Sequence, residues 1–276
     1  MDNSIFEKLE ILLEKVGDMS LKRRARKIIN ELNLKEGDRI IDIGCGDGFY
    51  LYLLSNLPIK LNLVGFDYDQ IVLTNARKNL ASKKIKLVQG SATDMPFKSG
   101  EFAKAIMTEV LEHIDDDEKA LNEVFRILKP KGVLFLTVPN YRFPFLWDPI
   151  NWLLQNIFGT HIEGTGFLAG IWARHLRLYK KEDLERIIKK SGFKIEVTEQ
   201  LTTRSLPFNH HLVNLVARLL YDVKPSSKIS DPLSKFKNAK KPFLVKVAFF
   251  IVNMFDKLND IFPGEQGLNL YIKAIK

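Results

Sequence analysis

Residues 40–48 form the densest run of chemically suggestive residues in the chain. They read Ile-Ile-Asp-Ile-Gly-Cys-Gly-Asp-Gly, so an apolar strand pattern passes through Asp42 and ends in Gly44, Gly46 and Gly48. Glycine lets a backbone turn tightly and approach a ligand closely, because no Cβ intervenes. A helix that starts after such a turn presents free N–H groups and its positive dipole end to the ligand.

The spacing of these glycines argues against a dinucleotide. A dinucleotide fingerprint would place its third glycine one residue later, at the position of Phe49. It would also need room for a pyrophosphate, whereas here Asp42 precedes the first glycine. A ligand with an ammonium group and no phosphate fits an acidic turn better, and an ordinary strand-to-helix turn remains the alternative.

A second acid ends the next apolar run. Asp67 follows residues 61–66 and lies about 20 residues past the glycines, where Rossmann-like folds hold a ribose. A carboxylate can accept hydrogen bonds from both ribose hydroxyls at once. Asp69 directly precedes a predicted helix and is the better helix cap, which leaves Asp67 for a ligand.

A third cluster contains Glu109, Glu112 and His113, spaced i, i+3 and i+4. If this stretch is helical, the three side chains share one face. Two carboxylates and an imidazole are suitable ligands for a divalent metal, and His175 is a candidate fourth ligand. The alternative needs no metal. His113 and His175 are then catalytic candidates that pack near a bound substrate or act as a base.

The rest of the sequence indicates the elements that position these residues. Short apolar runs alternate with amphipathic helices, which is typical of a sheet covered on both faces. We expect an α/β fold with a doubly wound, mostly parallel seven-stranded sheet, plus helical lid insertions. The predicted strands are residues 39–43, 61–66, 85–88, 103–107, 133–138, 193–198 and 268–275. The predicted helices are residues 20–32, capped by Ser20, then 49–57, 70–80, 118–128, 181–190 and 242–262.

Five stretches, in this order and spacing, resemble class I (Rossmann-like) S-adenosylmethionine-dependent methyltransferases of the type 11 kind. They are residues 42–48, Asp67, 89–97, 109–113 and 128–132. The resemblance covers about residues 35–140, the helix–strand unit 180–199 and the last strand. It implies an enzyme that uses S-adenosyl-L-methionine, and it does not specify the methyl acceptor.

The resemblance also implies roles for individual residues. Gly44, Gly46 and Gly48 would line the methionine part of the cofactor, with Asp42 near its ammonium group. Asp67 would hold the ribose.

Four further residues complete the cofactor site that the resemblance implies. Thr108 and Glu109 would face the methionine part, and Ser91 and Ala92 occupy the adenine position. The family usually has Asp where Ser91 stands, and a hydroxyl is a weaker acceptor for the adenine amine than a carboxylate.

The cluster that contains Glu109, Glu112, His113 and His175 also resembles the metal site of small-RNA 2′-O-methyltransferases and of quinone-biosynthesis O-methyltransferases. The same run is widespread in the class without metal. A divalent metal is therefore an alternative to the metal-free interpretation, which we favour.

We expect residues 1–34 to form an N-terminal helical cover and residues 35–276 the methyltransferase domain, with insertions at 140–175 and 199–267. The insertions are the acceptor-specific parts. Because they are rich in apolar residues, we expect methyl transfer to an apolar or amphiphilic small molecule or lipid. The alternatives are a metal-dependent RNA 2′-O-methyltransferase and a non-catalytic, cofactor-binding partner subunit.

Charge is concentrated in the C-terminal part of the chain. Residues 201–276 hold 12 Lys and Arg against 5 Asp and Glu, a net +7 of the total +9. Residues 224–246 hold seven Lys and only Asp231. A basic segment beside the apolar helix 242–262 predicts peripheral contact with an anionic membrane. A solvated lid edge is the alternative, and nucleic acid is disfavoured because arginine is sparse there.

The single cysteine, Cys45, cannot form an internal disulfide, and the N-terminal sequence lacks the pattern of a signal peptide. We therefore expect a cytoplasmic protein that lies at the periphery of the membrane.

Overall fold

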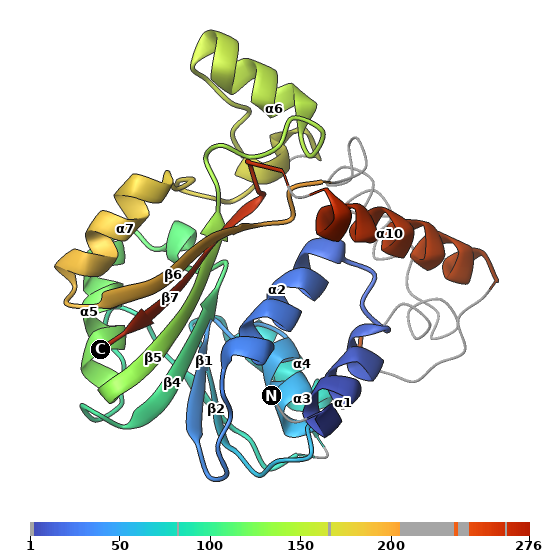
Figure 1. The fold of residues 1–276 in the computed structure, drawn as a ribbon. Helices are drawn as coiled ribbons and strands as arrows, with labels where there is room; N and C mark the ends of the chain where they lie inside the picture. The colour runs from blue at the N-terminus through green and yellow to red at the C-terminus, as the bar shows by residue number, and fades with distance from the viewer. Residues whose placement is uncertain (1–2, 82, 165–166, 205–234, 237–242, 263) are drawn as a thin grey trace.

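The computed structural model describes residues 3–81, 83–164, 167–204, 235–236, 243–262 and 264–276 (Figure 1). Its described part contains one seven-stranded sheet in the order β3-β2-β1-β4-β5-β7-β6. Five neighbouring strands are parallel, and β7 runs antiparallel to both β5 and β6. This confirms the predicted mostly parallel, doubly wound sheet. The strands are β1 (Arg39–Ile43), β2 (Asn62–Asp67), β3 (Lys86–Gln89), β4 (Phe102–Thr108), β5 (Leu128–Pro139), β6 (Lys194–Leu201) and β7 (Asn269–Ile275).

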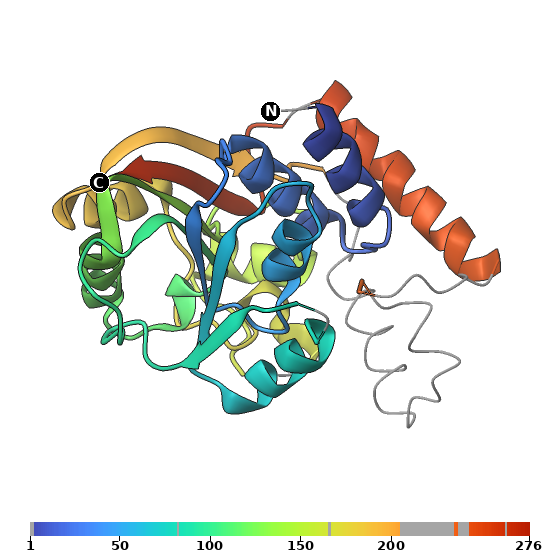
Figure 2. The ribbon, with the colours of Figure 1, turned by 90° about the horizontal axis from the view of Figure 1, so that it is seen from below.

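Helices cover both faces of the sheet, as Figures 1 and 2 show. One apolar cluster joins the sheet to α5 (Asp117–Ile127) and α7 (Lys181–Lys190). A second cluster on the other face joins it to four helices. These are α1 (Asn3–Leu13), α2 (Met19–Glu31), α3 (Phe49–Ser55) and α4 (Gln70–Asn79). Central strands buried on both faces read as continuous apolar runs, which explains the Ile-rich β1.

The register of the central strands places their carboxyl ends together. Ile43 at the end of β1 pairs with Phe66 on β2 and Met107 on β4. Ligands of open α/β sheets bind at this edge, where the strand order reverses. Here the reversal lies between β1 and β4.

The predicted cap of α2 was wrong. Asp18, not Ser20, is the N-cap, and its carboxylate accepts a hydrogen bond from Leu21 N at 3.0 Å. Ser20 lies inside the helix and is buried, and its hydroxyl donates to Asn269 Oδ1 at 2.8 Å. The hydroxyl therefore ties the N-terminal cover to the last strand.

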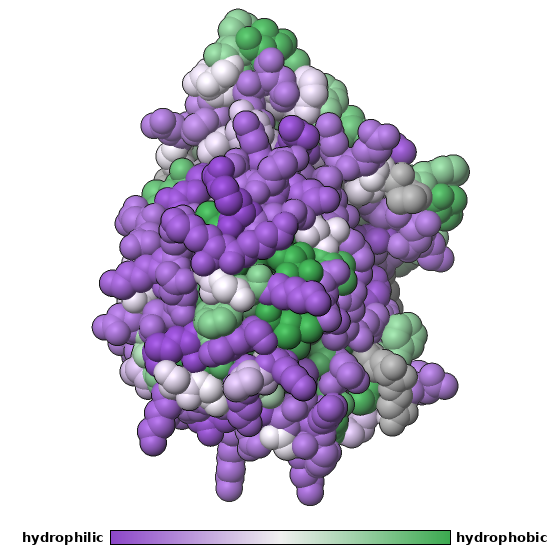
Figure 3. Space-filling model, turned by 60° about the vertical axis from the view of Figure 1, so that its left-hand side comes forward, coloured by the Kyte–Doolittle hydropathy of each residue, from purple (hydrophilic) through white to green (hydrophobic). Residues whose placement is uncertain are grey.

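The first insertion forms a projecting arm, residues 141–175, above the carboxyl ends of the strands (Figure 1). It contains α6 (Pro149–Leu153), a π-helical turn (Leu154–Phe158) and a 3-10 segment (Phe167–Trp172). The buried carboxylate of Asp148 holds its base by accepting from Asn151 N and Ile171 N. The arm exposes apolar side chains at its tip, which Figure 3 shows at the top of the view.

The second insertion contributes α10 (Phe243–Ile261), which lies against α2 (Figures 1 and 2). This confirms the helix predicted over residues 242–262. Most of the basic segment 224–246 lies outside the described residues, so its predicted membrane contact stays a prediction. Among the described residues, no helix is both long and apolar enough to cross a bilayer.

The cap of α4 provides a test of the fold. Asp69 accepts from Ile71 N at 2.7 Å, as predicted for a helix cap. Asp69→Ala should lower the free energy of unfolding by about 1 kcal/mol, because an N–H of the first turn loses its acceptor. Asp69→Asn keeps an acceptor and should change it much less. Urea denaturation measures both, and equal losses in the two variants would contradict the capping role.

Candidate active site

The glycine turn after β1 is held by the end of β2. Gly44 N and Cys45 N both donate to the carbonyl of Phe66, at 2.7 and 3.1 Å. Gly46 N donates to Asp67 Oδ2 at 2.9 Å, and the other Asp67 oxygen accepts from Asp69 N at 3.0 Å. The acid predicted to hold a ribose therefore also fixes the turn, and each of its oxygens keeps a second lone pair for a ligand.

The three turn glycines differ in what surrounds them. A Cβ at Gly44 would lie 2.2 Å from a Val110 methyl, and one at Gly48 would lie 2.8 Å from Leu80. These two glycines are required by packing. At Gly46, where φ is +52°, no described atom lies within 4 Å of the added Cβ. Open space beside a backbone N–H is the room that a bound ligand needs.

Asp42 is the most unusual group at this edge. Its side chain is 1% exposed, and among the described residues neither carboxylate oxygen has a hydrogen-bond partner. Burial, together with the nearby Asp67 and Asp47 carboxylates, raises its pKa well above the ordinary value. A buried carboxylate is costly unless it is paired. An ammonium group would supply the missing partner, so these residues fit the methionine part of S-adenosylmethionine.

The predicted adenine side lies next to Asp67, since Gly90 N donates to the Asp67 carbonyl at 3.0 Å. Ser91 is exposed, and its hydroxyl accepts from Thr93 N at 3.2 Å. Ala92 is half-buried and packs against the core. The Ser91 hydroxyl therefore shapes the loop.

Thr108 ends β4, half-buried and paired in register with Thr137, and the chain reverses after it. Glu109 follows with a left-handed φ of 54°. Its carboxylate accepts from Thr137 Oγ1 at 3.0 Å and from Asn269 Nδ2 at 2.8 Å. It also pairs with Arg24 Nη1 at 2.7 Å. Burial would lower the pKa of Arg24, but Glu109, Tyr50 and Asp18 together outweigh this and raise it.

The structure does not place Glu109, Glu112 and His113 on one helical face. Only residues Leu111–His113 form a helical turn, of the 3-10 type, and Glu109 precedes it with non-helical backbone. Glu109 therefore turns toward Arg24. The predicted four-residue cluster is reduced to Glu112, His113 and His175.

Those three side chains converge closely. Glu112 Oε1 lies 4.0 Å from His113 Nε2 and 3.9 Å from His175 Nε2, and the imidazole rings are 4.9 Å apart. Glu112 is fully buried, and neither of its oxygens has a hydrogen-bond partner among the described residues. Burial first, and then the Glu109 carboxylate, raises its pKa well above the ordinary value. A cation between the three groups would offset that cost, so the donor set fits a divalent metal.

The arm fixes the two histidines. His113 Nδ1 lies 3.0 Å from the Arg174 carbonyl, so this nitrogen carries the proton and donates it. Leu176 N donates to the Glu112 carbonyl at 3.0 Å. The base of the arm is thereby attached to the end of β4, and His113 Nε2 is left as the acceptor or ligand atom.

A cavity of about 180 Å³ lies beside Glu109 and His175. Its lining is partly polar and partly apolar. Its polar lining residues are Asp18, Ser20, Arg24, Glu109, His175 and Asn269, and its apolar ones are Pro139, Trp147, Ile171 and Leu268. Trp147, Ile171 and Leu268 belong to an apolar cluster that the arm builds with the start of β7.

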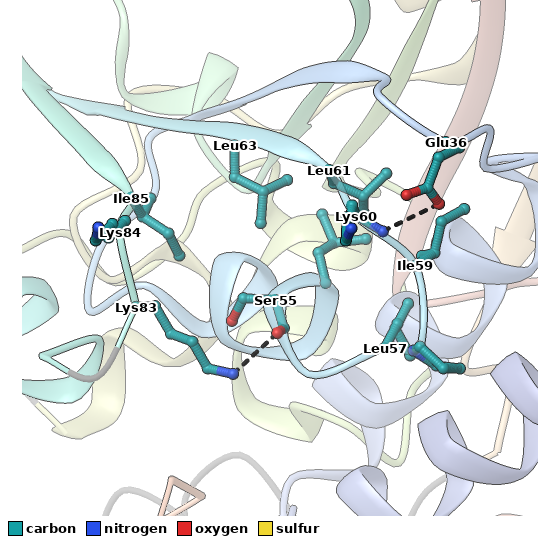
Figure 4. A pocket seen from close by; sticks show the side chains of 12 residues that line it. Glu36, Ser55, Leu57, Ile59, Lys60, Leu61, Leu63, Lys83, Lys84 and Ile85 are labelled. Atoms are coloured by element: carbon teal, nitrogen blue, oxygen red, sulfur yellow. Dashed lines mark hydrogen bonds between the residues drawn. The ribbon is translucent and has the colours of Figure 1, made fainter.

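A larger hollow of about 530 Å³ lies elsewhere (Figure 4). It is built around Leu61 and Leu63 at the start of β2, and Lys83 Nζ donates to the Ser55 carbonyl on its rim. Because the start of a parallel strand is opposite to its ligand-binding end, this hollow is not part of the candidate active site.

Sequence reasoning missed the contribution of the N-terminal cover. Asp18, Ser20 and Arg24 enter the cavity from α2, and Asn269 enters from β7. None of them belongs to a motif. The only available signal was Arg24 itself, a charged residue beside the apolar positions of an amphipathic helix.

Part of the chain is similar to known methyltransferases. Residues 41–136 match the family described as a methyltransferase domain. An uncharacterised protein of Methanocaldococcus jannaschii is 29% identical over 70% of this chain and 76% of its own length. The demethylmenaquinone methyltransferase of Lactobacillus johnsonii is 26% identical, over 64% of this chain and 76% of its own length. The sterol 24-C-methyltransferase of Pneumocystis carinii is 25% identical, over 68% of this chain and 48% of its own length.

Solved structures show the same fold. The [4+2]-cyclase SpnF is 16% identical with a TM-score of 0.59, over 92% of this chain and 80% of that one. A methyltransferase-like protein of Bacillus halodurans is 19% identical with a TM-score of 0.57, over 91% and 98%. The glycine turn, the acid at the tip of β2 and the match of residues 41–136 to a methyltransferase domain together support an S-adenosylmethionine-dependent methyltransferase.

Proposed function

We propose that the chain transfers the methyl group of S-adenosyl-L-methionine to an apolar or amphiphilic small molecule or lipid. The observation that carries this proposal is the mixed polar and apolar lining of the 180 Å³ cavity. Trp147 and Ile171 offer apolar contacts to the body of an acceptor, while Glu109 and His175 offer polar groups to its reacting end. Acceptors with one polar and one apolar end match such a lining.

In this proposal the two acids of the cofactor site divide the cofactor between them. Asp42 receives the ammonium group, Asp67 the ribose hydroxyls, and the space at Gly46 the chain between them. The sulfonium is already activated for transfer. The protein therefore contributes mainly alignment of the acceptor and exclusion of water.

An acceptor hydroxyl must lose a proton during transfer, and His175 is the proposed base. It lines the cavity, and its Nε2 lies 3.9 Å from Glu112 Oε1. An imidazole titrates near neutral pH, so it can take a proton and release it to solvent. His113 Nδ1 hydrogen-bonds to the carbonyl of Arg174, the residue before His175, and so helps to hold His175 near Glu112.

Two relatives support a lipid acceptor, because their names give a quinone and a sterol as the methylated compounds. Nucleic acid fits less well. A nucleic-acid groove gathers unpaired Lys and Arg. The described cavity instead contains the acids Asp18 and Glu109, and its one arginine, Arg24, is paired with Glu109.

A second candidate function is metal-dependent methyl transfer, and the convergence of Glu112, His113 and His175 favours it. A divalent ion there would act as a Lewis acid that lowers the pKa of an acceptor hydroxyl. The carboxylate of Glu112 is buried and has no hydrogen-bond partner among the described residues, so the ion would stabilise this group most.

Cofactor binding is tested at Gly46. Gly46→Val should abolish S-adenosylmethionine binding in titration calorimetry, because the side chain fills the open space beside the turn. Gly37→Val is the matched control. Gly37 also has a positive φ, of +80°, and no described atom within 4 Å of an added Cβ, but it lies before β1, away from the site. Both variants carry backbone strain, so only the cofactor-site variant should lose binding. Equal losses would contradict the assignment.

The acceptor class is tested with tritium-labelled S-adenosylmethionine. The protein should transfer label to a lipid extract and not to total RNA. His175→Ala should slow transfer by about 100-fold or more, since general-base catalysis contributes at least that much, while cofactor affinity stays unchanged.

The same assay separates the base from the metal. If His175 acts as a base, the reaction needs no metal ion. Adding a chelator should then leave the rate unchanged. Loss of activity on chelation, with a Mn²⁺-induced rise in melting temperature that His113→Ala removes, would favour the metal-dependent reaction. Label in RNA alone would overturn the proposed acceptor.

A further inference from the structure

Helix α10 exposes five of its described apolar side chains to solvent. Phe243, Val247, Phe250, Met254 and Ile261 are 78%, 38%, 69%, 51% and 62% exposed. They recur at i, i+4, i+7, i+11 and i+18, which places them on one face at 100° per residue. We name these five residues the α10 stripe. An amphipathic helix of a globular protein normally turns such a face inward.

The contacts that the described side chains of α10 make with α2 are polar. Arg23 on α2 pairs with Asp256 and with Asp260, the latter at 2.9 Å. Lys22 Nζ donates to Asn253 Oδ1 at 3.1 Å. Figure 1 shows α2 and α10 side by side.

The C-terminal half of α10 is tied down further by Asn259, which is 7% exposed. Its amide nitrogen donates to the Arg204 carbonyl at 3.0 Å and contacts Met19 Sδ at 3.8 Å. These contacts hold the C-terminal half of α10 against the segment after β6 and the start of α2.

The position of the helix connects it to the acceptor cavity. Met19, which Asn259 contacts, begins α2 between Asp18 and Ser20, and these two residues line the cavity. Helix α10 therefore lies close to residues that line the cavity.

We propose that the α10 stripe lies in the surface of an anionic lipid bilayer, with the helix in the plane of the membrane. The inference rests on the proposed function in one respect: the bilayer would be the source of the amphiphilic acceptor. An exposed apolar face of this length marks an interaction site. The described helix is not one that crosses a membrane, so contact is interfacial.

The positive charge near the α10 stripe favours an anionic bilayer, rather than a second copy of the chain, as its partner. Lys257 is exposed and lies three residues after Met254 and four before Ile261, beside the stripe. The sequence of residues 224–246, which leads into α10, holds seven Lys and one Asp. Two chains that both carry this excess of Lys repel each other, whereas anionic headgroups attract them.

The test is co-sedimentation of the full chain, without cofactor or acceptor, with phosphatidylcholine vesicles and with phosphatidylcholine–phosphatidylglycerol vesicles. Wild type should bind the anionic vesicles, and binding should fall as salt rises. Phe250→Glu should weaken binding by about tenfold or more, because it removes buried apolar area and adds a negative charge. Ile71→Glu on α4 is the matched control, since Ile71 is 74% exposed, and it should bind like wild type.

Failure to bind anionic vesicles at low salt would overturn the proposal, as would equal binding by wild type and Phe250→Glu. Sedimentation velocity without lipid gives another contrary outcome: a dimer that Phe250→Glu dissociates would make a second copy the partner. The acceptor is tested separately, since vesicle binding does not require methyl transfer. Binding without transfer of label to lipid would leave the surface in place and overturn the acceptor.

Discussion

The buried carboxylate of Asp42 is the interaction on which the site depends. It lies at the carboxyl end of a central strand, 1% exposed, with no hydrogen-bond partner among the described residues. Such a group opposes folding at neutral pH, because its folded-state pKa is raised. Strain of this kind is tolerated where a ligand relieves it. The surrounding sheet, buried on both faces, keeps water from doing so.

The remaining parts of the site are arranged around that point by different stretches of the chain. The glycine turn and Asp67 come from consecutive strands and meet because parallel strands align their carboxyl ends. The acceptor cavity has a separate origin. Its walls come from the N-terminal cover, the projecting arm and β7, joined through Glu109 and its ion pair with Arg24. In the proposed function, cofactor and acceptor are therefore bound largely by different parts of the chain.

This division explains how much the sequence alone could predict. The seven strands, the cap at Asp69 and the glycine turn depend on local periodicity and spacing, and the structure bears them out. The geometry of Glu109 did not follow, because a left-handed residue after β4 ended the helical spacing that the prediction assumed. Arg24 could not be assigned a role either, since its partner lies 85 positions away and only tertiary packing joins them.

The most direct measurement is the thermal unfolding of Asp42→Asn with and without S-adenosylmethionine. Without cofactor, the variant should melt at a higher temperature than wild type at neutral pH, because it removes an unpaired buried charge. That difference should vanish as the pH falls below the ordinary value of 3.8, where Asp42 is protonated in both states. With cofactor, wild type should gain more stability, since tighter binding gives a larger shift. A variant that is less stable without cofactor, or that gains as much from it, would contradict the account.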